Sequence, residues 1–393
     1  MTWAADGSGA ITVTVLGSTG SIGRQALDVL ATHPERFRVA GLAAGSNAEL
    51  LIAQAKEHRP RRVALADAAA AAQVRDAFGG DIEVLSGQDA AAALAAGGDD
   101  GPADIVLNGM VGSRGLLPTL AALKAGSRVA LANKESLIVG GELVMSAVQR
   151  PDQLVPVDSE HSALAQCLRA GREHEVERLI LTASGGPFRG RSREELGSVT
   201  VDDALSHPTW NMGARITVDS ATLANKGLEV IEAHVLFGIP YERIEVVVHP
   251  QSIVHGMVEF RDGATIAKLS PPDMRLPIQL ALGWPERLDS AVAQMDWRSP
   301  VNLQFEPVDA ETFPMIRIAR AAGLQGGTAP GVFNAADEEA VSAFLDRRID
   351  FLGIPAIVEA VLEEHQPEAG TDLETVLAAE QWARWRARAR LSE

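Results

Sequence analysis

A glycine-rich turn that begins at Gly17 constrains the fold of this chain more than any other feature. The β-rich run TVTVL at 12–16 leads into GSTGSIG at 17–23, and an amphipathic helical pattern follows. Glycines at such a turn let the backbone approach a dinucleotide pyrophosphate at the N-terminus of the helix. We therefore predict that Gly17, Gly20 and Gly23 form a dinucleotide-binding turn, although its spacing has one residue more than G-x-G-x-x-G. A plain strand-to-helix turn is the alternative interpretation.

The rest of the chain indicates an α/β protein with three parts. Short β-rich runs alternate with helical patterns from Ile11 to about Gly141, which predicts a Rossmann-like, doubly wound parallel sheet in a domain over 1–150. A mixture of β-rich and helical segments follows, and we predict a catalytic α+β domain over 151–300 with strands at 178–184, 214–220, 244–250 and 253–260. Helical patterns dominate from about Thr312, so we expect a C-terminal helical domain over 312–393.

The second β-rich run of the first domain bears on the choice of cofactor. An NAD-binding domain usually ends this strand with a carboxylate that binds the adenosine ribose. Here the run FRVAGLAAGSN ends in Gly45, Ser46 and Asn47, which include hydrogen-bond donors and no acid that would repel a 2′-phosphate. We therefore predict NADP(H) rather than NAD(H).

Three carboxylates suggest a metal site. Asp158 and Glu160 are two residues apart in a segment, LVPVDSE, that we interpret as a strand, so both side chains should leave one face and Ser159 the other. We expect Glu229 to open a helix after a glycine. Oxygen-only ligands suit Mg²⁺ or Mn²⁺, and a cation would relieve the mutual repulsion of three acids. An exposed strand edge is the alternative interpretation for Asp158 and Glu160.

Donors suited to a phosphate monoester surround these acids. Ser184 lies in ASGGPF, and Ser220, Asn225 and Lys226 lie in VDSATLANKG, where hydroxyl, amide and ammonium groups stand close to glycines. Each could instead be an ordinary turn, cap or surface residue. Their grouping with Glu229 favours a phosphate site.

A long polar segment between Pro187 and Gly213 ends in HPTWNMG. Structureless segments of this length in compact domains are often active-site lids, and an aromatic tip can exclude water. We predict a lid over 187–213, while a core anchor for Trp210 and a helix-end position for His207 are equally consistent with the pattern.

Composition excludes several classes of protein. A formal charge of −17 over 393 residues argues against a nucleic-acid or anionic-membrane surface, and the single cysteine, Cys167, excludes an intrachain disulfide framework. We expect Cys167 to be a buried or half-buried residue of a helix, and a reactive thiol is the less favoured alternative. The chain has no apolar run long enough for a membrane span and no signal-peptide pattern at its start, so we expect a cytoplasmic protein.

Ordered motifs along essentially the whole chain closely resemble the 1-deoxy-D-xylulose 5-phosphate reductoisomerase family. The motifs are LGSTGSIG, LANKES, VDSEHSA, ASGGPF, HPTWNMG, VDSATLANKGLEVIEAH, HPQSIVHGMVEF, PPDMRLPI and FNAADEEAV. The resemblance implies an NADPH- and metal-dependent enzyme of the non-mevalonate isoprenoid route, and it suggests a homodimer. The implied reaction rearranges 1-deoxy-D-xylulose 5-phosphate, a phosphorylated ketose, and reduces the product to 2-C-methyl-D-erythritol 4-phosphate.

The resemblance also implies roles for individual residues. Asp158, Glu160 and Glu229 would bind Mn²⁺ or Mg²⁺. The catalytic residues would be Lys134, Glu160, His207 and Glu229. Substrate contacts would come from these four residues and from Ser159, Ser184, Trp210, Ser220, Asn225 and Lys226. NADPH contacts would come from Thr19, Gly20, Ser21, Ile22, Gly45, Ser46, Asn47, Asn133, Glu135 and Gly213. One departure is Ser46, which stands where this family often has a basic residue.

Two other functions remain as alternatives. A simple NADP-dependent dehydrogenase of a sugar phosphate or semialdehyde would share the first domain but would rarely need three carboxylates on a metal. A non-catalytic NADPH-binding regulator would have little reason to keep those carboxylates together with the phosphate donors.

Overall fold

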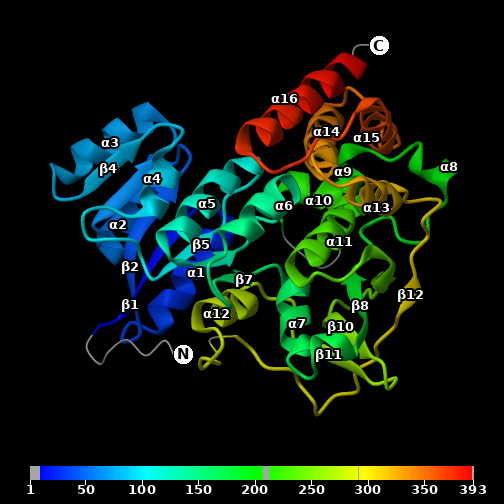
Figure 1. Cartoon of the computed structure of the whole chain (residues 1–393), viewed down its shortest axis with the longest axis horizontal. Coiled ribbons are helices and arrows are strands. Elements are labelled where there is room, and N and C mark those ends of the chain that lie inside the picture. Colours follow the sequence, from blue (N-terminus) through cyan, green and yellow to red (C-terminus); the bar gives the residue numbers. More distant parts are fainter. Residues whose placement is uncertain (1–8, 207–211, 291, 392–393) are drawn as a thin grey trace. The chain divides into compact units, whose positions relative to one another are not determined.

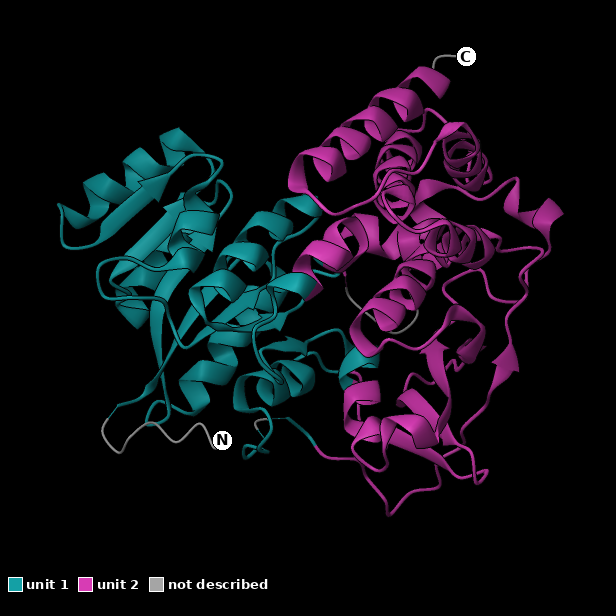
Figure 2. Cartoon of the chain, in the orientation of Figure 1, with its two compact units in different colours: residues 1–136, 146–162, 273–293 teal, residues 137–145, 163–272, 294–393 magenta. Residues whose placement is uncertain are grey.

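The structure is a computed structural model, and it describes residues 9–206, 212–290 and 292–391 (Figure 1). The chain forms two compact units (Figure 2). Unit 1 comprises Met1–Ser136, Ser146–Ser162 and Asp273–Ala293, and unit 2 comprises Leu137–Met145, Ala163–Pro272 and Gln294–Glu393. Within the described ranges, no helix is both long and apolar enough to cross a bilayer.

Unit 1 contains a seven-stranded sheet in the order β4-β3-β2-β1-β5-β6-β7, and each neighbouring pair of strands in this order is parallel. The strands are β1 (Ile11–Leu16), β2 (Phe37–Ala44), β3 (Arg62–Leu65), β4 (Glu83–Ser86), β5 (Ile105–Asn108), β6 (Arg128–Leu131) and β7 (Leu154–Pro156). The helices are α1 (Ser21–Thr32), α2 (Ala48–His58), α3 (Ala68–Phe78), α4 (Ala90–Ala96), α5 (Leu116–Ala125), α12 (Arg275–Gly283) and the first residues of α6 (Glu135–Ala147). The predicted doubly wound α/β architecture is confirmed.

The strand order of this sheet determines where a ligand can bind. Strand β1 lies between β2 and β5, so the connections leave it in opposite directions on its two sides. Ligands of open α/β sheets bind at such a switch point, outside the carboxyl ends of the strands. The glycine-rich turn follows β1 directly and therefore stands at this position.

Unit 2 combines a mixed sheet with helices. Its order is β11-β10-β8-β9-β12, in which β8 and β9 are parallel and the other neighbours are antiparallel. The strands are β8 (Val176–Ala183), β9 (Ile244–Val248), β10 (Val254–Phe260), β11 (Thr265–Leu269) and β12 (Glu306–Pro307). The helices are α7 (Ser159–Leu168), α8 (Arg193–Leu196), α9 (Val201–Ala204), α10 (Ala214–Ala221), α11 (Ala224–Phe237), α13 (Met315–Gln325), α14 (Ala329–Leu345), α15 (Gly353–Glu364) and α16 (Leu373–Arg390).

Two predicted strands are wrong in whole or in part. Residues 214–220 form helix α10, in which Thr217, Val218 and Asp219 are buried in succession while Ile216 is exposed, so the alternation that suggests a strand is accidental. The segment LVPVDSE leaves its strand after Pro156, and helix α7 begins at Ser159. The face-sharing argument for Asp158 and Glu160 therefore fails.

Domain limits follow packing rather than chain order. Helix α12, which lies in the predicted second domain, contacts α1, and its residues Ile278, Ala281 and Leu282 belong to the hydrophobic core of unit 1. The helices after 312 share one core with the mixed sheet. The division at 150 and at 300–312 stays a prediction.

The predicted lid segment contains more regular structure than a loop. Helices α8 and α9 each begin with a capping box, in which Ser192 and Thr200 accept hydrogen bonds from the backbone N–H of Glu195 and Asp203. His207 and Trp210 lie outside the described residues.

Candidate active site

The turn after β1 has no room for a side chain at Gly17 or at Gly23. A Cβ on Gly17, whose φ is +74°, would lie 2.6 Å from the carbonyl oxygen of Gly109, and a Cβ on Gly23 would lie 2.3 Å from that of Gly17. Gly20 is the N-cap of α1 and has no side chain to occupy the first N–H groups of the helix. This backbone cradle suits a pyrophosphate group at the N-terminus of α1.

Other predicted cofactor residues hold neighbouring loops in place. Asn133 is buried and donates hydrogen bonds to the carbonyl oxygens of Met110 and Gly112, at 3.0 and 2.9 Å. Glu135 accepts a hydrogen bond from the Gly112 N–H at 3.0 Å. These bonds join the segments that follow β5 and β6, at the carboxyl edge of the sheet. Their contact with a cofactor stays a prediction.

The end of β2 carries the predicted ribose-binding residues. Gly45, Ser46 and Asn47 are exposed, and Asn47 caps α2 by accepting a hydrogen bond from the Leu50 N–H at 3.1 Å. Thr19, Ser21 and Ile22 lie in the turn and in the first residues of α1. Gly213 is the N-cap of α10 in unit 2.

The acids near 158 come from a helix N-terminus rather than from a strand. Asp158 immediately precedes α7, and Glu160 lies in its first turn. The unit boundary falls inside this helix, after Ser162, and the following turns contribute Leu164 and Cys167 to the core of unit 2. Because α7 is one continuous helix, its first turn, which carries Glu160, belongs to the same helix as those core residues.

Electrostatics keep Asp158 ionised. Its carboxylate pairs with the ammonium group of Lys134, and its second oxygen lies 3.8 Å from Nδ1 of His161. Burial alone would raise the pKa of Asp158, but Lys134, His161 and a hydrogen bond with Glu160 hold it well below its usual range. Ser159 donates a hydrogen bond from its hydroxyl to Glu160.

Helix α11 presents three predicted site residues on one face. Asn225 donates from Nδ2 to Oε1 of Glu229 at 2.6 Å, and the buried ammonium of Lys226 pairs with the other oxygen of Glu229. The spacings of four and three residues place these side chains on successive turns. Glu229 lies in the second turn of α11, so our expectation that it opens the helix is wrong.

The three predicted metal ligands do lie together. Each of Asp158, Glu160 and Glu229 offers a carboxylate oxygen, and these oxygens all lie within 4.8 Å of one another. Three hard oxygen donors with no sulfur among them fit Mg²⁺ or Mn²⁺ and do not favour zinc.

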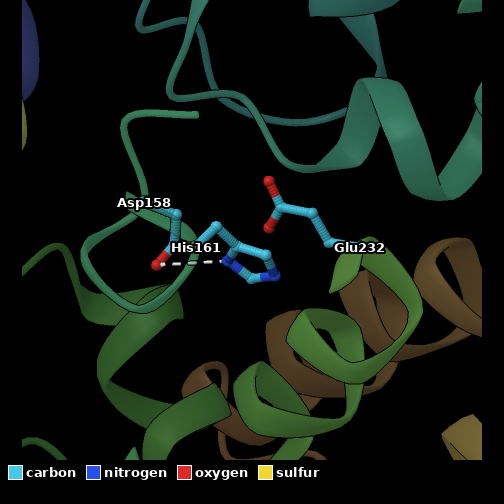
Figure 3. A group of neighbouring side chains, drawn as sticks. All are labelled: Asp158, His161 and Glu232. Carbon is cyan, nitrogen blue, oxygen red and sulfur yellow. Dashed lines mark ion pairs between the residues drawn. The ribbon is translucent and has the colours of Figure 1, made fainter. Parts of the chain in front are cut away.

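A second group adds two residues that sequence reasoning did not single out. Asp158, His161 and Glu232 offer ligand atoms within 4.8 Å of one another, and His161 and Glu232 are fully buried (Figure 3). Both follow a predicted ligand by three residues, since His161 follows Asp158 and Glu232 follows Glu229. That helical spacing is the signal that could have found them.

The chain segments that carry the predicted phosphate donors of unit 2 are neighbours at the turn that follows β8. Ser184 follows β8, and its hydroxyl accepts a hydrogen bond from the Gly186 N–H at 3.2 Å. A Cβ on Gly186 would lie 2.7 Å from the carbonyl oxygen of Ser220, so this turn lies against the end of α10. Leu223, whose φ is +62°, connects α10 to α11, so Asn225 and Lys226 of α11 follow Ser220 closely in the chain.

A dinucleotide-binding turn in a doubly wound sheet, together with a carboxylate site for a hard cation, defines the class of metal-dependent, NADP-linked oxidoreductases. Comparisons with known proteins specify the family. Family models described as 1-deoxy-D-xylulose 5-phosphate reductoisomerase, its C-terminal domain, and the DXP reductoisomerase C-terminal domain match residues 13–141, 154–237 and 269–386. The chain belongs to the 1-deoxy-D-xylulose 5-phosphate reductoisomerase family.

Relatives match over nearly their full length. The reductoisomerases of an Arthrobacter species and of Beutenbergia cavernae are 56% and 57% identical, over 97% of this chain and 98% of each relative. The Zymomonas mobilis enzyme, solved with NADPH, is 42% identical with a TM-score of 0.91, over 98% of this chain and 100% of that one. A DOX-P reductoisomerase solved with NADPH, fosmidomycin and magnesium is 36% identical with a TM-score of 0.91, over 97% and 98%.

Proposed function

We propose that this protein converts 1-deoxy-D-xylulose 5-phosphate to 2-C-methyl-D-erythritol 4-phosphate with NADPH and a divalent metal, in the non-mevalonate isoprenoid route. The observation that carries the proposal is the group of three carboxylate oxygens from α7 and α11, in a chain that also has a dinucleotide-binding turn. Family membership and the NADPH and magnesium of solved relatives support it.

Asp158, Glu160 and Glu229 would hold the metal, which we propose to be Mg²⁺ or Mn²⁺ in the cell. A cation bound there would polarise substrate carbonyl and hydroxyl oxygens as a Lewis acid. Lys134 keeps Asp158 ionised and so maintains the negative charge of the site. Lys226 and Asn225 hold Glu229 in a fixed orientation, and both would also contact the substrate.

The phosphate group of the substrate would bind at the turn of Ser184 and at the start of α11. Ser184, Ser220, Asn225 and Lys226 would supply hydroxyl, amide and ammonium donors there, and Gly185 and Gly186 add no side chains to this turn. Binding the phosphate away from the reacting carbons orients the substrate for rearrangement. Ser159 and His207 would add further contacts.

NADPH would bind along the carboxyl edge of the sheet of unit 1, where it would supply the hydride. The turn residues Gly17, Thr19, Gly20, Ser21 and Ile22 would receive the pyrophosphate, and Gly45, Ser46 and Asn47 the adenosine ribose and its 2′-phosphate. Asn133, Glu135 and Gly213 would complete the site.

The assembly we propose is a homodimer. Large apolar side chains are exposed in one stretch of unit 2, where Trp297 is 69% exposed and Phe305 is 44% exposed, with Val301 and Leu303 between them. Exposed apolar clusters often mark subunit interfaces. Sedimentation equilibrium tests the dimer, and cell fractionation tests the proposed cytoplasmic location.

The function is tested by following NADPH absorbance with purified protein, 1-deoxy-D-xylulose 5-phosphate and either Mn²⁺ or Mg²⁺. An EDTA control removes the metal, and NMR identifies the product. Metal-dependent oxidation with a branched polyol phosphate is the expected result. Oxidation that gives an unbranched product would support the simple dehydrogenase, and NADPH binding without oxidation would support the regulator.

A further inference from the structure

Two buried carboxyl groups outside the proposed active site lie on helices α10 and α14, which contact each other, and they are close enough for the charge of one to act on the other. Asp219 of α10 is 3% exposed, and Asp337 of α14 is fully buried. Neither carboxyl oxygen of Asp337 has a hydrogen-bond donor within the part of the chain that the structure describes. A buried carboxylate that accepts no hydrogen bond is strongly unfavourable. The simplest remedy is a proton on one of the two acids.

The charges around this pair favour that proton. Arg215 of α10 lies 3.6 Å from Asp219, but it also pairs with Glu338 of α14 at 2.7 Å. Arg384 of α16 pairs with Glu338 as well, and at 2.6 Å with Glu380 of its own helix. Acids therefore outnumber bases around the pair. Burial, and then the charge of Asp219, raise the pKa of Asp337 well above its ordinary value, although Arg215 lowers it.

The position of Asp219 connects this pair to the proposed phosphate site. Helix α10 has only 8 residues, and a helix this short requires tertiary contacts for stability. Ser220 follows Asp219 directly, and its carbonyl oxygen lies against the turn of Ser184 and Gly186. A shift of Asp219 would therefore move the Ser220 end of α10.

We propose that Asp219 and Asp337 share one proton in the folded protein, and that this hydrogen-bonded pair is a positioning device that holds Ser220 at the phosphate site. The positioning role rests on the proposed function, whereas the shared proton does not. Carboxyl groups that cannot both ionise commonly share a proton in this way.

The pair gives stability a definite pH dependence. The unfolded acid ionises near its ordinary pKa of 3.8, whereas the folded Asp337 keeps its proton to a higher pH. Between these two values the folded state binds more protons, so the free energy of unfolding falls as pH rises. The amide introduced by Asp337→Asn cannot ionise, and it can donate to Asp219 as the protonated acid does.

The first experiment compares wild type, Asp337→Asn and the control Asp346→Asn, which changes an exposed acid that follows the same helix. Infrared spectra at neutral pH should show the C=O band of an un-ionised carboxylic acid in wild type and in the control, but not in Asp337→Asn. Urea unfolding from about pH 5 to pH 9 should show a stability advantage of Asp337→Asn that grows with pH. Identical spectra and parallel pH profiles would overturn the shared proton.

The second experiment tests positioning with Asp337→Ala, which removes the donor and leaves Asp219 charged. Amide hydrogen exchange over 214–221 should be faster than in wild type, and Asp337→Asn should restore protection. The KM for 1-deoxy-D-xylulose 5-phosphate should rise by roughly tenfold with little change in kcat. Unchanged exchange would overturn the positioning role even if the protein had no reductoisomerase activity. A protein without that activity that still showed the exchange difference would refute only the proposed function.

Discussion

Single side chains of α11 determine how the proposed metal site is built. Glu229 is 1% exposed and has both a buried ammonium partner and an amide partner. A carboxylate this deep is tolerated because its charge is compensated at short range. The same arrangement fixes the direction of its oxygens, which is what a metal ligand requires.

Replacing Glu229 with Gln should lower metal-dependent turnover by orders of magnitude, because the amide is a poor ligand for a hard cation and carries no charge to pair with Lys226. NADPH affinity should hardly change, since the proposed nucleotide contacts lie mainly in unit 1. Steady-state kinetics and NADPH titration measure the two quantities, with Glu177→Gln as an exposed control. Equal losses of turnover and NADPH affinity would contradict this division of roles.

Cys167 should react slowly with thiol reagents in the native protein. Its side chain is buried, and burial raises the pKa of the thiol to about 11 despite the nearby Lys268 ammonium, so almost no thiolate exists at neutral pH. Mass spectrometry after iodoacetamide treatment should find little labelling until urea unfolds the chain. Rapid labelling of the native protein would show that Cys167 is accessible.

At the level of elements, the regular β/α alternation of unit 1 was predictable, whereas two site-bearing elements were not. Residues 214–220 contain the consecutive β-branched residues Ile216, Thr217 and Val218, and LVPVDSE continues a real strand, so local preference favours strands at both places. Packing overrides this preference, because α10 buries Val218 and Ala221 in the core of unit 2. The proposed metal ligands are predictable from their chemistry, although the strand predicted for Asp158 and Glu160 and the helix start predicted for Glu229 are wrong.

Helix α11 packs closely against α13 because Gly227 has no side chain. A Cβ at Gly227 would lie 2.6 Å from the Cβ of Ala319 and 3.1 Å from the carbonyl oxygen of Met315. Gly227→Ala should therefore lower the free energy of unfolding by about 1–3 kcal/mol. Gly331→Ala is the helical control, because a Cβ at Gly331 would lie 3.6 Å from its nearest neighbour, the Cα of Val139. Its free energy of unfolding should be unchanged or slightly higher. Urea denaturation distinguishes them, and equal stability of the two variants would refute the packing argument.

The lid proposed over 187–213 has its own test in Trp210→Ala. If the segment closes over the substrate, loss of the indole should lower kcat/KM through poorer exclusion of water, while the fold stays intact. Steady-state kinetics measures the loss, and far-ultraviolet circular dichroism checks the fold. Unchanged kinetics would remove the lid role, and unfolding would favour the core-anchor interpretation.

Among the described residues, the buried apolar side chains form two separate hydrophobic cores, one in each unit. The chain passes between the units several times, with α6 and α7 each divided between them. Separate cores often unfold as separate cooperative units.

Calorimetry should accordingly resolve more than one unfolding transition. NADPH should raise the transition temperature of unit 1, because a ligand stabilises the state it binds. At 100 times its dissociation constant, NADPH should stabilise folded unit 1 by about 2.7 kcal/mol. A metal ion with inorganic phosphate should mainly raise the transition temperature of unit 2. A single transition whose calorimetric and van't Hoff enthalpies agree would contradict independent unfolding.

The sequence by itself determined the doubly wound sheet, the dinucleotide-binding turn and the chemistry of the metal site. Each depends on local periodicity or on residue type, which the chain carries wherever it folds. Tertiary structure decided that Asp158 precedes a helix, that Ser220 lies in one, that α12 belongs to the core of unit 1, and that His161, Glu232 and Asp337 are buried. Those features depend on burial and on charges distant in the chain, which local sequence patterns do not encode.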